Sequence, residues 1–116
     1  MIVQLPYPHK ILWPNGGEGN RFVKSSEKKK HKQWAYMATL AAMGGNKFVP
    51  DADKIPVHLI VGSKPRGPEP DKDNCVSAMK AYQDGIAMAL GVNDRLFAAP
   101  IVHFSGRNST FTIEVG

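Results

Sequence analysis

Residues 65–70 contain three prolines and one glycine, and this segment constrains the fold more than any other part of the chain. Proline fixes φ and lacks a backbone N–H, so a regular helix cannot run through the segment. The residues before it, Val57–Val61, are rich in β-branched side chains, which favours a strand. The residues after it take a helical apolar spacing from about Asn74. The chain must therefore change from strand to helix at this loop.

Similar signals divide the first half of the chain. We expect a strand at residues 2–5, ended by a proline, and a helix at about residues 27–43 with Ser25 or Ser26 as its N-cap. Two glycines at positions 44 and 45 would end that helix. Its apolar residues recur at the spacing of one face, which we expect to be buried: Trp34, Met37, Ala38 and Ala41.

The second half of the chain continues the alternation. A helix from about Asn74 to Leu90 is followed by strands at 101–104 and 111–115. The expected buried side of this helix consists of Val76, Met79, Gln83, Ile86, Ala87 and Leu90. The order β-α-β-α-β-β predicts an α+β fold, with a mixed four-stranded β-sheet and two main helices. We expect one domain over residues 1–116.

The chain is basic, with 15 Lys and Arg residues, 10 Asp and Glu residues and a net charge of +5. A basic domain of this size suggests a polyanionic partner such as nucleic acid. The alternative is a charged surface that is only solvated. The residues that would contact DNA phosphates lie in the N-terminal region, the first helix and the proline-rich loop: Lys10, Arg21, Lys24, Lys28, Lys29, Lys30, Lys32, Lys64 and Arg66.

Several classes of protein are excluded by composition. The one cysteine, Cys75, rules out an internal disulfide and a cysteine-built zinc site, and is typical of a reducing compartment. The N-terminal residues lack the basic and apolar regions of a signal peptide. No apolar run approaches the roughly 20 residues that a membrane span needs. We therefore expect a cytoplasmic protein without a membrane partner.

Two carboxylates, Asp71 and Asp73, directly follow the proline-rich loop. If this segment is extended, both side chains project to the same side and need a cation between them. Oxygen ligands suit Mg²⁺. Lys80 comes seven residues after Asp73, nearly two helical turns, so it shares the helix face and could stabilise negative charge on a phosphate.

Each of these residues also has a purely structural interpretation. Asp71 or Asp73 could cap the second helix. Lys80 could pair with Asp84 at the helix surface. A third carboxylate, Asp94, follows the second helix and could be an ordinary turn residue.

The motif Asp71-Lys72-Asp73-Asn74, with Lys80, Asp84-Gly85 and Gly91-Val92-Asn93-Asp94, resembles the signature of the RusA family of Holliday-junction resolvases. The N-terminal Leu5-Pro6-Tyr7-Pro8-His9-Lys10 is similar to the opening of that family. The lysine of the best-known pattern comes four residues after the second aspartate, whereas it comes seven residues after it here.

The resemblance implies a homodimeric, RusA-like endodeoxyribonuclease that binds four-way (Holliday) DNA junctions and cuts them by paired symmetric nicks with Mg²⁺ or Mn²⁺. Asp71, Asp73 and Asp94 would be the catalytic, metal-binding acids, and Lys80 the catalytic lysine. Three alternatives stay open: a nuclease that acts on flaps or other branched DNA, a catalytically inactive protein that binds branched DNA, and an unrelated small α+β protein whose acids bind a metal ion structurally.

Other residues that often carry chemistry are given structural roles. Trp13 could stack on an unpaired base, but a buried tryptophan is the commoner case. His58 and His103 are expected to be strand residues that are satisfied locally. Cys75 is expected to be a small helix residue.

Overall fold

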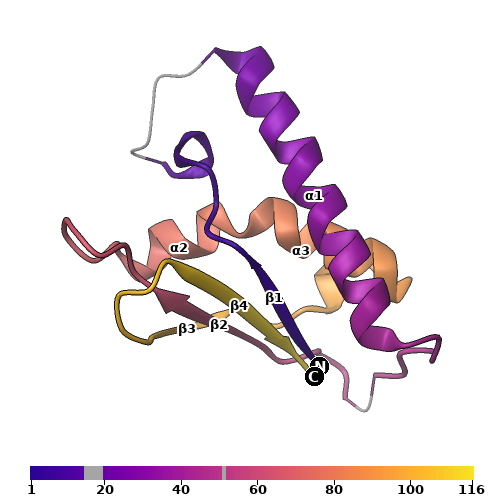
Figure 1. Cartoon of the computed structure of the whole chain (residues 1–116). Coiled ribbons are helices and arrows are strands. Elements are labelled where there is room, and N and C mark those ends of the chain that lie inside the picture. The colour runs from indigo at the N-terminus through magenta and orange to yellow at the C-terminus, as the bar shows by residue number, and fades with distance from the viewer. Residues whose placement is uncertain (15–19, 51) are drawn as a thin grey trace.

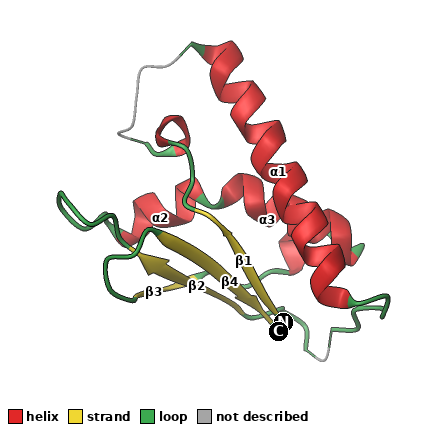
Figure 2. Ribbon diagram, viewed as in Figure 1, coloured by secondary structure: helices red, strands yellow, loops and turns green. Residues whose placement is uncertain are grey.

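The computed structural model describes residues 1–14, 20–50 and 52–116. Its regular elements are coloured along the chain in Figure 1 and by type in Figure 2. The strands are β1 (Ile2–Pro6), β2 (Val57–Gly62), β3 (Ile101–Phe104) and β4 (Thr110–Val115). The α-helices are α1 (Arg21–Met43), α2 (Lys72–Ala78) and α3 (Lys80–Leu90), and the 3₁₀ helices are η1 (Lys10–Leu12) and η2 (Asp94–Leu96). Among the described residues, no helix is both long and apolar enough to cross a membrane.

The four strands form one mixed sheet in the order β1-β4-β2-β3. Strand β4 pairs antiparallel with β1 and with β2, while β2 and β3 are parallel. Parallel neighbours need a long crossover connection, and here α2 and α3 supply it. The predicted α+β class and mixed four-stranded sheet are confirmed.

All three α-helices cover the same face of the sheet (Figures 1 and 2). Alternate strand residues point into this layer and are buried, among them Val3, Leu59, Phe111 and Ile113. Their neighbours on the opposite face are exposed or only partly buried. The core therefore lies between the sheet and the helices, and the other sheet face is open.

Helix α1 begins earlier than the sequence indicated, so the prediction of Ser25 or Ser26 as its N-cap is wrong. The cap is Asn20, whose side-chain oxygen accepts a hydrogen bond from the backbone N–H of Phe22 at 2.8 Å. Asparagine is as good an N-cap as serine, so the helix gains its first turn and a half from residues before Ser26.

The predicted buried face of α1 is also largely wrong: of its four residues only Ala38 packs against the core, where it is partly buried, and Ala41 is exposed. Trp34 and Met37 are exposed by 37% and 55%, whereas the buried residues are His31, Ala35 and Thr39. The buried face is small or polar because α1 lies very close to α3. A Cβ atom on Gly85 would stand 2.2 Å from the carbonyl oxygen of Lys32. Close approach of the two backbones, rather than apolar bulk, selects this face.

The predicted second helix is divided at Met79 into α2 and α3, and it begins at Lys72 rather than near Asn74. Helical hydrogen bonds continue across the division, since Met79 N–H donates to Cys75 O at 3.0 Å and Gln83 N–H donates to Met79 O at 2.9 Å. The predicted buried residues Met79, Ile86, Ala87 and Leu90 are buried, while Val76 and Gln83 are only partly so. The prediction missed four buried residues: Cys75, Ala78, Tyr82 and Gly85.

Candidate functional site

The acid pair lies at the N-terminal end of α2. Asp71 occupies the N-cap position with extended backbone (φ −64°, ψ 149°), and Asp73 belongs to the first helical turn. The segment that carries the two aspartates is therefore not wholly extended, which was the condition for both side chains to project to the same side. The side chain of Asp71 makes no capping hydrogen bond to any described residue, and both aspartates are exposed. A helix N-terminus carries partial positive charge, which favours two carboxylates there.

Lys80 lies on the same helix face as Asp73. Residues 73, 77, 80 and 84 are all exposed, and their spacing of four, three and four residues follows one stripe of the helix. The rise along the axis from Asp73 to Lys80 is about 10 Å. The alternative pairing of Lys80 with Asp84 is not found: the ion pairs among the described residues join Glu27 to Lys30 and His31.

Asp94 lies at the other end of the helical crossover, in η2. Residues 72–90 place roughly 28 Å of helix between Asp71 and the end of α3 if the two helices are nearly collinear, as Figure 1 shows. Within residues 1–14, 20–50 and 52–116, no three His, Cys, Asp or Glu side chains are close enough to hold a metal ion. One chain therefore brings Asp71, Asp73 and Lys80 to one region and leaves Asp94 apart from them.

A pocket of about 270 Å³ is lined by residues that precede the acid pair in the sequence. Its walls come from two distant segments, the N-terminal region with Tyr7, Lys10 and Trp13, and the β2–α2 loop with Lys64 and Arg66. Pro70, the residue before Asp71, completes the lining. The pocket thus combines aromatic rings with three cations, and the chain leads directly from its lining into Asp71.

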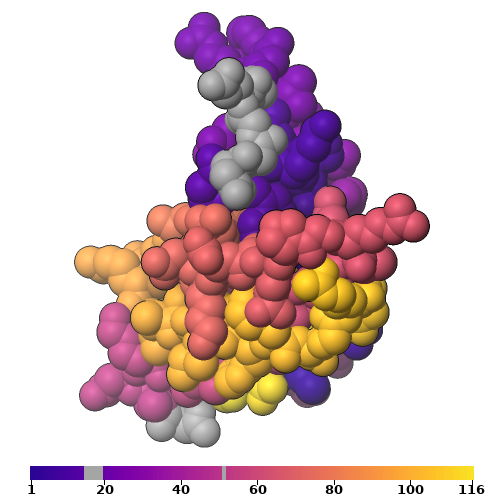
Figure 3. Space-filling view, turned by 90° about the vertical axis from the view of Figure 1, so that its left-hand side faces the viewer, coloured from indigo at the N-terminus to yellow at the C-terminus, as the bar shows by residue number. Residues whose placement is uncertain are grey.

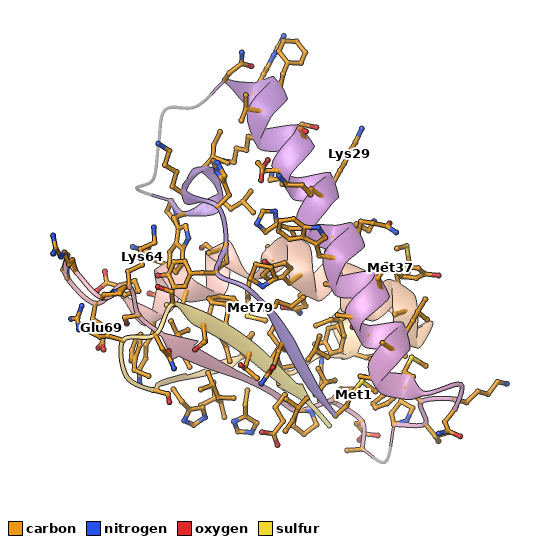
Figure 4. The ribbon with its side chains drawn as sticks, in the orientation of Figure 1. Met1, Lys29, Met37, Lys64, Glu69 and Met79 are labelled. Atoms are coloured by element: carbon orange, nitrogen blue, oxygen red, sulfur yellow. The ribbon has the colours of Figure 1, made fainter. Side chains whose placement is uncertain are left out.

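The figures show how the two walls meet. In the space-filling view of Figure 3, the surface of the β2–α2 loop lies between the indigo N-terminal segment and the yellow residues of the β3–β4 turn. Figure 4 shows Lys64 on the side of this loop that faces the N-terminal segment, and its ammonium group lies 5.4 Å from the centroid of the Tyr7 ring.

The remaining predicted DNA contacts gather on the first half of α1, which projects beyond the sheet in Figure 1. All of them are exposed, and Lys29 points away from the rest of the molecule in Figure 4. Lys30 is partly engaged, since its ammonium group lies 3.0 Å from Glu27 Oε2 and 5.3 Å from the centroid of the Trp34 ring. The predicted DNA contacts thus form two groups, one on α1 and one at the pocket.

The N-terminal segment is held in place by a residue to which the sequence assigned no chemistry. His31 is buried in α1, and its Nε2 accepts a hydrogen bond from the backbone N–H of His9 at 3.1 Å. Its Nδ1–H donates to the carbonyl of Glu27 at 2.7 Å, which fixes the neutral tautomer. Burial lowers the pKa of His31, in keeping with that neutral form. The bond joins residues 22 apart, which spacing along the chain cannot reveal.

Three structural roles expected from the sequence are confirmed. Trp13 is buried, and its indole N–H donates to the carbonyl of Pro8 at 3.2 Å. His58 and His103 satisfy each other, with Nδ1 of the first 3.0 Å from Nε2 of the second. Cys75 is buried in α2, and burial raises the pKa of its thiol to about 11. A thiol with so high a pKa is a poor nucleophile at neutral pH.

Comparison of this chain with protein-family models, with curated proteins and with solved structures found no match.

Proposed function

We propose that this chain is a metal-dependent endodeoxyribonuclease of the RusA type, which resolves four-way DNA junctions by paired symmetric nicks. The observation that carries the proposal is the setting of the acid pair. Asp71 and Asp73 are exposed, and the side chain of Asp71 makes no capping hydrogen bond to any described residue. Pro70, the residue before Asp71, lines a cationic pocket. The resemblance of the Asp71–Asn74 motif to the RusA signature supports the same function.

The two carboxylates that one chain supplies are suitable ligands for Mg²⁺ or Mn²⁺. Mg²⁺ commonly takes one or two carboxylates and completes its shell with waters and substrate phosphates. Asp71 and Asp73 would hold the ion, which when bound would lower the pKa of a water and stabilise the attacking and leaving oxygens. A third acid is not available within the described part of one chain. The proposal therefore assigns Asp94 to the second copy of a homodimer, in which two-fold symmetry would give two equal sites.

Other residues of the chain would act on the DNA itself. Lys80, on the same helix face as Asp73, would stabilise the negative charge that develops on the scissile phosphate. Lys10, Lys64 and Arg66 would hold the neighbouring phosphates, and the lysines of α1 would hold an arm of the junction further away. These phosphate contacts position the DNA but do not read its sequence.

One observation favours a second candidate function. Asp94 is separated from the acid pair by the whole helical crossover. A chain with only two of three metal-binding acids in place could recognise branched DNA without cutting it. A third candidate keeps the same site but acts on flaps or other branched DNA.

A cleavage assay distinguishes these functions. Labelled four-way junction, flap and linear duplex DNA are incubated with the protein in Mg²⁺ or in EDTA. We expect paired symmetric nicks in the junction that require the metal. The Asp73→Asn variant should lose cutting at least 100-fold and keep its junction affinity, because an exposed carboxylate near phosphates does not strengthen binding.

The matched control is Asp53→Asn, which makes the same change of charge at an exposed position outside the motif. It should cut like the unchanged protein. Binding of the junction without metal-dependent cutting would favour the inactive DNA-binding protein. Preferential cutting of the flap would favour the broader nuclease, and cutting that survives Asp73→Asn would contradict the assigned site.

A further inference from the structure

We propose that the pocket between η1 and the β2–α2 loop binds one unpaired nucleotide of the DNA, with its base against Tyr7 and its phosphate on Lys10, Lys64 and Arg66. This inference rests on the proposed function only in taking DNA as the ligand. It adds a reason why branched DNA would be preferred over duplex.

The aromatic wall of the pocket is rigid. The Tyr7 ring is stacked on Trp13, with ring centroids 5.3 Å apart and planes 19° apart. Trp13 is held by its hydrogen bond to Pro8 and by the edge of Phe111, whose centroid lies 6.3 Å away. Tyr7 is itself only partly buried. A fixed, accessible ring on a buried aromatic base suits the stacking of a nucleobase, because little side-chain freedom is lost on binding.

The cationic wall is also fixed, by Arg107 of the β3–β4 turn. One guanidinium nitrogen, Nη1, donates to the carbonyl of Lys64 at 3.0 Å and to that of Gly67 at 2.8 Å. Gly67 has φ 93°, which favours glycine and bends the loop. Lys64 and Arg66 are therefore presented from a loop of defined shape, and the pocket exists before any DNA binds.

The groups in the pocket match the two halves of a nucleotide. Base–aromatic stacking tolerates any base, and ammonium and guanidinium groups bind phosphate. The ammonium group of Lys64 covers the Tyr7 ring at 5.4 Å from its centroid. An exposed cation–π contact is weaker than base stacking, so a base can displace this ammonium group, which is then free to reach the phosphate.

Size and position favour a single unpaired nucleotide. The volume of about 270 Å³ lies just below the usual range of small-ligand pockets, which is the scale of a single nucleotide. A base within a duplex is stacked and paired on both sides, whereas the continuous stacking is interrupted at a branch point, so a base there is more easily unpaired and displaced. Because Pro70 lines the pocket and Asp71 follows it, a nucleotide held there would bring an adjacent phosphate towards the acid pair.

The test measures binding in EDTA, so that no cleavage takes part. Fluorescence anisotropy compares a labelled oligothymidylate with an abasic oligomer of the same length, which has the same phosphates but no bases. We expect oligothymidylate to bind about tenfold more tightly, the effect of one base–aromatic stack. Tyr7→Leu should remove this preference, and Tyr7→Phe should keep it.

Two lysine variants separate the phosphate contact from the base contact. Lys64→Gln should weaken both oligomers by a similar factor of about three to ten, whereas Lys47→Gln, an exposed lysine that does not line the pocket, should weaken neither. Thermal unfolding checks that Tyr7→Leu is folded. If Tyr7→Leu is unfolded, Lys64→Gln, which replaces an exposed side chain, still tests the pocket.

Each outcome has one meaning. Equal binding of the two oligomers, or a preference that survives Tyr7→Leu, would overturn the nucleotide pocket. Tighter binding of oligothymidylate without metal-dependent cutting of the junction would support the nucleotide pocket and contradict the nuclease function. Failure to bind either oligomer at low salt would contradict both.

Discussion

His31 shows how one residue can make the stability of this protein depend on pH. It is buried, its Nε2 accepts from the backbone of His9, and its Nδ1–H donates to the carbonyl of Glu27. Protonation would remove the acceptor on which His9 depends. Burial lowers the pKa of His31 in the folded protein, partly countered by Glu27 and reinforced by the charges of Lys30 and His9. The folded state therefore binds this proton less readily than the unfolded chain does.

We predict a loss of stability as the pH falls. The contribution of a neutral His31 is fully present above the pKa of the unfolded chain, near 6.5, and is lost as the pH drops from there towards the lower folded pKa. Urea unfolding at pH 7.5 and pH 5.5 measures the effect. His31→Gln should be less stable at pH 7.5 by about 1–2 kcal/mol and should lose less stability between the two pH values. An unchanged pH dependence in this variant would assign the effect to other groups.

Among the elements, the helices show what the sequence can and cannot predict. The existence of the helices and strands followed from local signals such as the prolines of residues 65–70 and the glycines after Met43. The buried face of α1 did not, because it is decided by a partner far along the chain. Ala35 is inside since the α3 backbone lies close to it at Gly85, and no periodicity of apolar residues in α1 records that contact.

Gly85 provides a test of this close packing. An added methyl group would stand 2.2 Å from the backbone carbonyl of Lys32 and 3.0 Å from Cβ of Ala35. Since a backbone atom cannot turn aside, Gly85→Ala should force the two helices apart, although alanine has the better helix propensity. We expect a loss of about 2–3 kcal/mol in the free energy of unfolding, measured by urea denaturation.

The control for Gly85→Ala is Asp84→Ala, which changes the exposed neighbouring residue of the same helix. It should alter the free energy of unfolding by no more than about 0.5 kcal/mol. If Gly85→Ala were as stable as the unchanged protein, α1 and α3 would not approach as closely as the structure indicates.

At the scale of the whole molecule, some features of the candidate site follow from local sequence spacing and others depend on contacts between distant segments, as in the fold. Asp73 and Lys80 lie on one helical stripe, so their spacing in the sequence was enough to place them together. The pocket joins Tyr7 to Lys64, and its loop is fixed by Arg107. These residues come from three separate segments, and only the assembled sheet brings them together. The position of Asp94 depends on the length and direction of the α2–α3 crossover, which a spacing in sequence does not give.

The separation of Asp94 from the acid pair leads to a prediction about the assembled protein. If a second copy supplies Asp94, each site of a homodimer takes its acid pair from one chain and Asp94 from the other. Asp73→Asn and Asp94→Asn should then each be inactive alone. A mixed dimer of the two variants would have one site with Asp73 and Asp94 both intact and one site with both replaced, because two-fold contacts are reciprocal.

Mixing the two inactive variants, after unfolding and refolding them together to exchange subunits, should therefore restore metal-dependent nicking of a four-way junction. With equal amounts and random pairing, about half of the dimers are mixed and each has one working site, so about a quarter of the original sites return. Because the second site of a mixed dimer is inactive, the product should be a singly nicked junction rather than resolved duplexes. Two variants refolded separately and then assayed together serve as the control. Failure of co-refolding to restore any nicking would show that Asp94 does not act across the dimer, since an acid that acts within its own chain leaves every mixed dimer with two damaged sites.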